Sequence, residues 1–112
     1  MLARPHRLTR GADYKAVVRR GRRCAAEHTV TYVGTASDAE SVRFGFIVSK
    51  QVGGAVVRNT VRRRLKAVCA EALPGVGGGH DIVIRALPAA ASADYSQLRD
   101  EVVRCLSRKA AA

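Results

Sequence analysis

The sequence predicts an α+β domain in which three helices pack against one small central mixed sheet, in the order α-β-β-α-β-α. Two observations support this prediction. Two segments, 55–72 and 95–106, carry apolar residues every three or four positions, which is the period of an amphipathic helix. Three other segments are rich in β-branched or alternating apolar residues, as strands are. The 112 residues are enough for one domain, which we place at 1–112.

The first half of the chain predicts one helix followed by two strands. Apolar residues at helical spacing before a glycine predict a helix over residues 11–20. Residues 24–33 end in a β-branched and aromatic run, which we interpret as one strand. Residues 42–49 alternate with period two, and we expect this strand to pair antiparallel with the one before it.

The second half predicts a long helix, a strand and a final helix. The apolar stripe of the helix over 55–72 is formed by Val57, Val61, Leu65, Val68 and Ala72. The glycines before it match neither glycine-rich phosphate-binding pattern, so we interpret them as a tight strand-to-helix turn. Residues 81–87 predict a buried strand parallel to the strand before the helix. Ser92 or Asp94 can cap the last helix.

Positive charge dominates the composition. Twenty Lys and Arg residues against nine Asp and Glu give a net charge of +11, and sixteen of the twenty are arginine. Guanidinium groups pair with phosphate in a bidentate manner and stack on bases, so this composition favours a nucleic-acid partner. A membrane surface is the competing partner, but no helix has a spare broad apolar face for it. The longest apolar runs, of about five residues, are far shorter than a membrane span.

No group of residues in the sequence forms a recognisable catalytic or metal site. The cysteines are far apart and lack metal-ligand spacing: Cys24, Cys69 and Cys105. We therefore expect three reduced thiols in a reducing cytosol. The histidines have no partner in sequence and are expected at the surface or at an edge: His6, His28 and His80. The acidic residues are scattered, so self-sufficient hydrolytic catalysis is not predicted.

The helix over 55–72 carries a row of cations without acidic neighbours. Arg58, Arg62 and Lys66 step by four along the edge of the apolar stripe, with Asn59 and Arg63 just beyond them. A solvated helix face normally mixes charges of both signs, because opposite charges four residues apart attract. The row therefore favours a polyanion, whose phosphates would give affinity and position rather than sequence choice.

Base stacking would need aromatic side chains, which make up only 4% of the chain. Tyr14 and Tyr32 are the candidates, and each could instead pack in the core or at an edge.

Two runs on either side of the glycine turn carry a family resemblance. They are FGFIVSK at 44–50 and VGGAVVRN at 52–59, which continues into RRRLK at 62–66. Together with Arg7-Leu8, Asp13-Tyr14 and Gly21, they resemble the signature of the bacterial ribonuclease P protein subunit, over nearly the whole chain.

The resemblance implies a fold and a function. The fold would be like domain 2 of ribosomal protein S5, with an unusual left-handed βαβ crossover against the usual right-handed rule. The protein would join a catalytic RNA in the cytoplasm and assist removal of the 5′ leader from precursor tRNA. The RNA and its Mg²⁺ would carry the chemistry, so no residue of this chain is expected to be catalytic or to bind metal, and no DNA partner is expected.

The resemblance also implies site residues. The expected RNA-binding residues are Lys50, Arg58, Asn59, Arg62, Arg63 and Lys66. The expected leader cleft is formed by Tyr14, Val18 and Tyr32. The sequence departs from the family's usual residues at Gln51, Gly54, Thr60 and Val18. The alternative function is a structural ribosomal-type RNA-binding protein without a role in processing.

Overall fold

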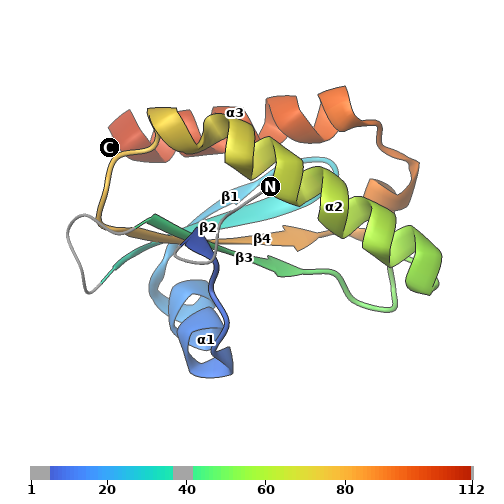
Figure 1. Cartoon of the computed structure of the whole chain (residues 1–112), viewed down its shortest axis with the longest axis horizontal. Helices are drawn as coiled ribbons and strands as arrows, with labels where there is room; N and C mark the ends of the chain where they lie inside the picture. The colour runs from blue at the N-terminus through green and yellow to red at the C-terminus, as the bar shows by residue number, and fades with distance from the viewer. Residues whose placement is uncertain (1–5, 37–41, 112) are drawn as a thin grey trace.

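Four strands form one mixed sheet in the part of the chain that the computed structural model describes, residues 6–36 and 42–111. In spatial order the strands are β1 (Arg22–Ala25), β2 (Thr29–Thr35), β4 (His80–Ala86) and β3 (Val42–Ile47). The helices are α1 (Gly11–Arg20), α2 (Ala55–Ala72) and α3 (Tyr95–Ala111), with short 3-10 helices η2 (Leu73–Gly75) and η3 (Pro88–Ser92). Helices α2 and α3 cover one face of the sheet, and α1 lies on the other (Figure 1).

The predicted helices are confirmed. Helices α1 and α2 begin and end at the predicted residues, and α2 buries the middle of its apolar stripe against the sheet. Helix α3 begins after Asp94, as predicted. The Asp94 carboxylate accepts a hydrogen bond from the N–H of Gln97 at 2.8 Å, and the Gln97 side chain accepts one from the N–H of Asp94 at 3.0 Å. This reciprocal capping box satisfies backbone donors at the start of α3.

The prediction of a single strand over 24–33 is wrong. The segment contains the end of β1, a turn and most of β2, so the observed order has one strand more than predicted. The two strands pair antiparallel, with Cys24 opposite Thr31, and the N–H of Ala26 donates to the carbonyl of Thr29 at 2.8 Å. The turn contains no glycine, proline or asparagine, so the usual sequence signal of a hairpin is missing.

The predicted antiparallel pairing of β3 with the preceding strand is also wrong. Strand β4 lies between them, antiparallel to β2 and parallel to β3, with Phe44 beside Ile82. The predicted parallel pairing across α2 is confirmed. In Figure 1 strand β3 lies nearer the viewer than β4, with α2 above both, so the β3–α2–β4 crossover has the left-handed sense that the family resemblance implies.

Apolar side chains form a core on each face of the sheet. The larger core lies under α2 and α3 and includes Phe44, Leu65, Ile82 and Leu98. The smaller core lies under α1 and contains Leu8, Val17, Val30, Tyr32 and Val83. Among the described residues no helix combines the length and hydropathy needed to cross a membrane.

The expectation of three reduced thiols is wrong for two of the cysteines. Cys24 on β1 and Cys105 on α3 form a disulfide, and their Cα atoms are 5.8 Å apart. The two residues are 81 positions apart in sequence, so only the docking of α3 on the sheet reveals the pairing. Cys69 is a free thiol in the larger core, and burial raises its pKa well above the usual value.

Candidate nucleic-acid interface

The predicted cations lie together on α2, beside the stripe that docks on the sheet. Val61, Leu65 and Val68 are buried and fix which side of the helix faces the core. We define the α2 ridge as the polar residues next to this stripe: Arg58, Asn59, Arg62, Arg63 and Lys66. Each is exposed or only half-buried, and the one hydrogen bond between ridge side chains runs from Arg62 to the Asn59 carbonyl oxygen at 3.2 Å.

The protein's own described carboxylates do not neutralise the α2 ridge. No described carboxylate oxygen lies within 4.0 Å of a ridge nitrogen. The described acidic side chains lie elsewhere: Asp13 and Asp81 at Arg43, Glu71 at Tyr95, Asp94 at Gln97, Asp100 at Arg99, and Glu27 and Glu101 at His28. The ridge cations therefore repel one another until an external anion lies against them.

Two basic residues near the ridge have different environments. Arg64 donates to the carbonyl of Ala93 at 2.8 Å, so this arginine fastens α2 to the segment before α3. Lys50 is exposed in the connection that leads from β3 to the start of α2 (Figure 1).

In the same connection Gly53 has a φ of 157°, and an added Cβ would lie 3.0 Å from Val57. This close approach supports the interpretation of the glycines as a tight turn.

A second candidate surface is an open cavity of about 580 Å³ between α1 and β3. We call it the α1–β3 groove, and its lining consists of Tyr14, Lys15, Val18, Arg19 and Ile47. Tyr14, Val18 and Ile47 supply an aromatic and aliphatic surface, and the cations Lys15 and Arg19 are exposed beside it. This combination suits single-stranded nucleic acid, because bases stack on apolar surface while cations follow the backbone.

Tyr14 is held in place from both sides. Its hydroxyl accepts a hydrogen bond from the N–H of Phe46 and donates one to the carbonyl of Leu8, each at 3.2 Å. The neighbouring Asp13 lies 3.7 Å from Arg43, which also forms two hydrogen bonds with Asp81 at 3.0 and 2.8 Å. These hydrogen bonds raise the pKa of Arg43. The ion pairs tie α1 to the sheet and thereby fix the α1–β3 groove.

Gly45 allows the Tyr14 ring to lie against β3. A Cβ at this position would be 2.5 Å from one ring carbon of Tyr14 and 2.7 Å from its hydroxyl oxygen. We expect Gly45→Ala to displace the ring and to lower the free energy of unfolding by about 1–2 kcal/mol, measured by urea denaturation. In a Tyr14→Ala background the same substitution should cost much less, because no ring remains to displace. Equal costs in both backgrounds would contradict this account of Gly45.

Tyr32 does not line the α1–β3 groove, although Tyr14 packs against the core cluster that contains it. Tyr14 and Val18 line the α1–β3 groove, whereas the side chain of Tyr32 packs in the smaller core and is 6% exposed. The prediction omitted Lys15 and Arg19, although each directly follows a predicted cleft residue in the sequence. It also omitted Gly45, whose role depends on a contact between residues 31 positions apart and has no local signal.

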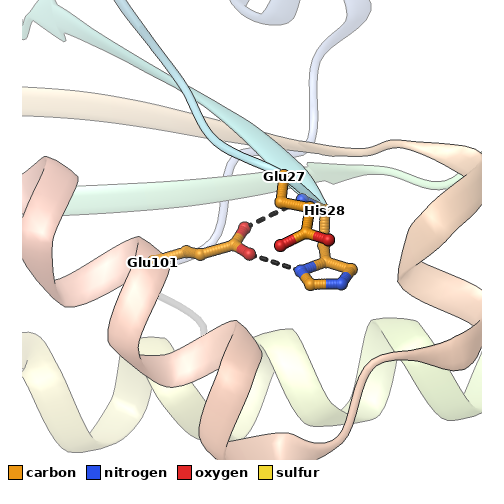
Figure 2. A group of neighbouring side chains, drawn as sticks. All are labelled: Glu27, His28 and Glu101. Carbon is orange, nitrogen blue, oxygen red and sulfur yellow. Dashed lines mark hydrogen bonds and ion pairs between the residues drawn. The ribbon is translucent and has the colours of Figure 1, made fainter.

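One group of side chains has donor atoms close enough to hold a metal ion: Glu27, His28 and Glu101, whose ligand atoms lie within 4.8 Å of one another. Figure 2 shows Glu101 reaching from α3 to the β1–β2 turn. Its carboxylate accepts hydrogen bonds from the N–H of His28 at 3.1 Å, the His28 imidazole and the Thr29 hydroxyl at 3.0 Å. Both Glu101 oxygens are therefore occupied, and this arrangement caps the turn.

The same contacts correct the expectation for one histidine. His28 is 7% exposed rather than at the surface, and its partner is 73 residues away in sequence. The carboxylate of Glu101 replaces the turn residues that a short hairpin normally uses.

Comparison with known proteins gives consistent results. The family model described as Ribonuclease P matches residues 2–110. The ribonuclease P protein component of Acidothermus cellulolyticus is 47% identical over 109 residues, covering 96% of this chain and 91% of that protein. The corresponding protein of Clavibacter michiganensis subsp. michiganensis is 48% identical over 108 residues, covering 96% of each.

Solved structures show the same fold. The RNase P protein of Staphylococcus aureus superposes with a TM-score of 0.81 at 23% identity, covering 94% of each chain. The RNase P protein of Thermotoga maritima gives a TM-score of 0.80 at 22% identity, covering 91% of this chain and 96% of that one. At these identities the structural likeness bears on the fold alone.

Proposed function

Because this chain belongs to the ribonuclease P protein family and is the protein subunit of that enzyme, we propose that its α2 ridge contacts the catalytic RNA and that its α1–β3 groove receives the 5′ leader of precursor tRNA. The chemistry of the holoenzyme is carried by the RNA subunit. The ribosomal alternative is not favoured, since the relatives above carry the ribonuclease P name.

The unneutralised α2 ridge is the observation that carries the first half of this proposal. Its side chains are exposed or half-buried and lie next to the buried stripe formed by Val61, Leu65 and Val68. A folded RNA would remove their mutual repulsion and release counterions from its own phosphates. The ridge would therefore supply affinity and orientation. The fold of the RNA would determine which part of the RNA surface the ridge contacts.

The composition of the α1–β3 groove supports the second half. A leader is single-stranded, so its bases can stack on Tyr14 or pack against Val18 and Ile47 while Lys15 and Arg19 face its phosphates. Mature tRNA lacks this 5′ leader. The groove would thus favour precursor over product.

We assign Mg²⁺ to the RNA subunit. The donor group at Glu27, His28 and Glu101 serves the β1–β2 turn and is remote in sequence from the residues of the ridge. We also expect the protein to act in the bacterial cytoplasm, where precursor tRNA is processed.

Reconstituted cleavage tests the proposal. The purified protein should let a cognate catalytic RNA cleave precursor tRNA at Mg²⁺ concentrations at which the RNA alone is slow. The protein without RNA should leave the substrate intact. Absence of stimulation would refute the proposed role in processing, and cleavage by the protein alone would indicate a free-standing nuclease.

A negative charge placed in the α1–β3 groove should lower the affinity for leader-bearing precursor tRNA selectively. Val18 is 36% exposed, so Val18→Glu should fold, and its carboxylate should repel leader phosphates. We expect a roughly fivefold loss of affinity for leader-bearing precursor and little change for mature tRNA, measured by equilibrium binding to the holoenzyme. The matched control is Val103→Glu on α3, a valine that is 41% exposed. Equal losses for precursor and mature tRNA would count against the groove as the leader site.

A further inference from the structure

The Cys24–Cys105 disulfide joins the outermost strand of the sheet to the last helix. Strand β1 has four residues and pairs with β2 alone. Cys24 is its one buried residue, whereas the flanking Arg22 and Arg23 are exposed. The disulfide is therefore the principal side-chain anchor of β1 on the helical layer.

A second anchor lies one turn earlier on α3. Glu101 precedes Cys105 by four residues, so both side chains leave the same face of the helix. Glu101 holds the β1–β2 turn through His28 (Figure 2) and through the Thr29 hydroxyl, and neither contact involves the disulfide. The hairpin can therefore remain folded on α3 when the sulfur atoms separate, which makes opening of the disulfide compatible with a native fold.

A buried hydroxyl lies across the strand pair from Cys24. Thr31 is paired with Cys24 across the two strands and is 0% exposed, and its hydroxyl has no hydrogen-bond partner among the described residues. A buried hydroxyl without a partner destabilises the state that contains it. Local opening of β1 lets water reach this hydroxyl, which lowers the cost of the opening that gives an external thiol access to Cys24.

We propose that Cys24 and Cys105 form a redox modification site, a reversible disulfide that exchanges with low-molecular-weight thiols and fastens β1 to α3. Local opening of the edge strand β1 exposes the buried Cys24, an external thiolate attacks its sulfur, and the bond to Cys105 breaks. Cys105 leaves as a thiolate and takes up a proton. A second thiolate then attacks the mixed disulfide, releasing the external disulfide and the Cys24 thiolate, which is also protonated. The reverse sequence, driven by a low-molecular-weight disulfide, restores the bond.

The experiment equilibrates the full-length protein in buffers of defined glutathione to glutathione disulfide ratio. Remaining thiols are alkylated in denaturant and counted by intact mass. We expect one alkylated cysteine, Cys69, at oxidising ratios and three at reducing ratios, with the same transition from either direction. The Cys69→Ala variant should change from none to two. Three alkylated cysteines at every ratio, a disulfide that includes Cys69, or a bond that native protein never releases would each overturn the proposal.

Thermal unfolding supplies the second readout. The closed disulfide spans 81 residues, so the oxidised protein should melt higher than the reduced protein by on the order of 10 °C. Amide hydrogen exchange in β1 should be faster in the reduced protein, because the strand loses its anchor. The Cys24→Ala/Cys105→Ala variant should melt at the same temperature in both buffers. A redox-dependent melting temperature in that variant, or none in the parent protein, would overturn the fastening role.

Discussion

Replacing Arg62 and Lys66 together with alanine is expected to weaken binding of the catalytic RNA roughly 30-fold near 0.15 M salt. Each phosphate contact contributes about fivefold at this salt concentration through counterion release, and two contacts are lost. The slope of log affinity against log salt should fall by about 1.4–1.8 units. Filter binding or fluorescence titration at several salt concentrations measures both quantities.

The matched control removes the same charge elsewhere. Arg99 and Arg104 lie on α3 rather than on α2, and their double replacement with alanine gives the same net charge. That variant should retain nearly the parental slope. If the two double variants lose affinity equally, the effect comes from net charge, and the α2 ridge is not the contact surface.

Tyr32→Ala should lower the free energy of unfolding by roughly 3–5 kcal/mol, because it leaves a cavity beneath α1. The ring packs with Val17, Val30 and Val83 and is 6% exposed, which leaves little of it for a base. Urea denaturation measures the loss, and Tyr32→Phe, which keeps the ring, should be close to the parent protein.

Binding measurements on Tyr32→Ala distinguish a packing role of this ring from a role in stacking on a base. Under conditions where Tyr32→Ala remains folded, its affinity for leader-bearing precursor and for mature tRNA should change by the same factor. A loss confined to the precursor, of roughly 1–3 kcal/mol, would instead support the stacking role predicted from the sequence.

The sequence was most informative for α2, where the helical periodicity alone predicts which face is buried. In α2 the apolar stripe determines which face is buried, so the neighbouring cations of the ridge were expected to lie outside the core. It was least informative in β2, whose residues Thr29 to Tyr32 are all buried because helices cover both faces of the sheet. Such a strand shows no alternation, and the burial of Tyr32 could not be deduced from it.

The other errors share one physical cause, which is that the deciding partner is distant in sequence. The β1–β2 turn depends on Glu101, and the fate of two cysteines depends on α3. The partner of β3 is a strand that comes after the next helix. The local secondary-structure propensity of a segment does not depend on such distant contacts and cannot predict them. Helix boundaries and caps depend on neighbouring residues and were predicted correctly.

The insertion of β4 between β2 and β3 has a consequence for biosynthesis. While the ribosome is still making the chain, β3 has no adjacent strand and α2 has no finished sheet on which to bury its stripe. The nascent polypeptide must therefore delay folding until residue 86 has left the tunnel. In a prematurely terminated product α2 would have no complete sheet on which to dock, so the ordered α2 ridge forms only after the last strand has been made.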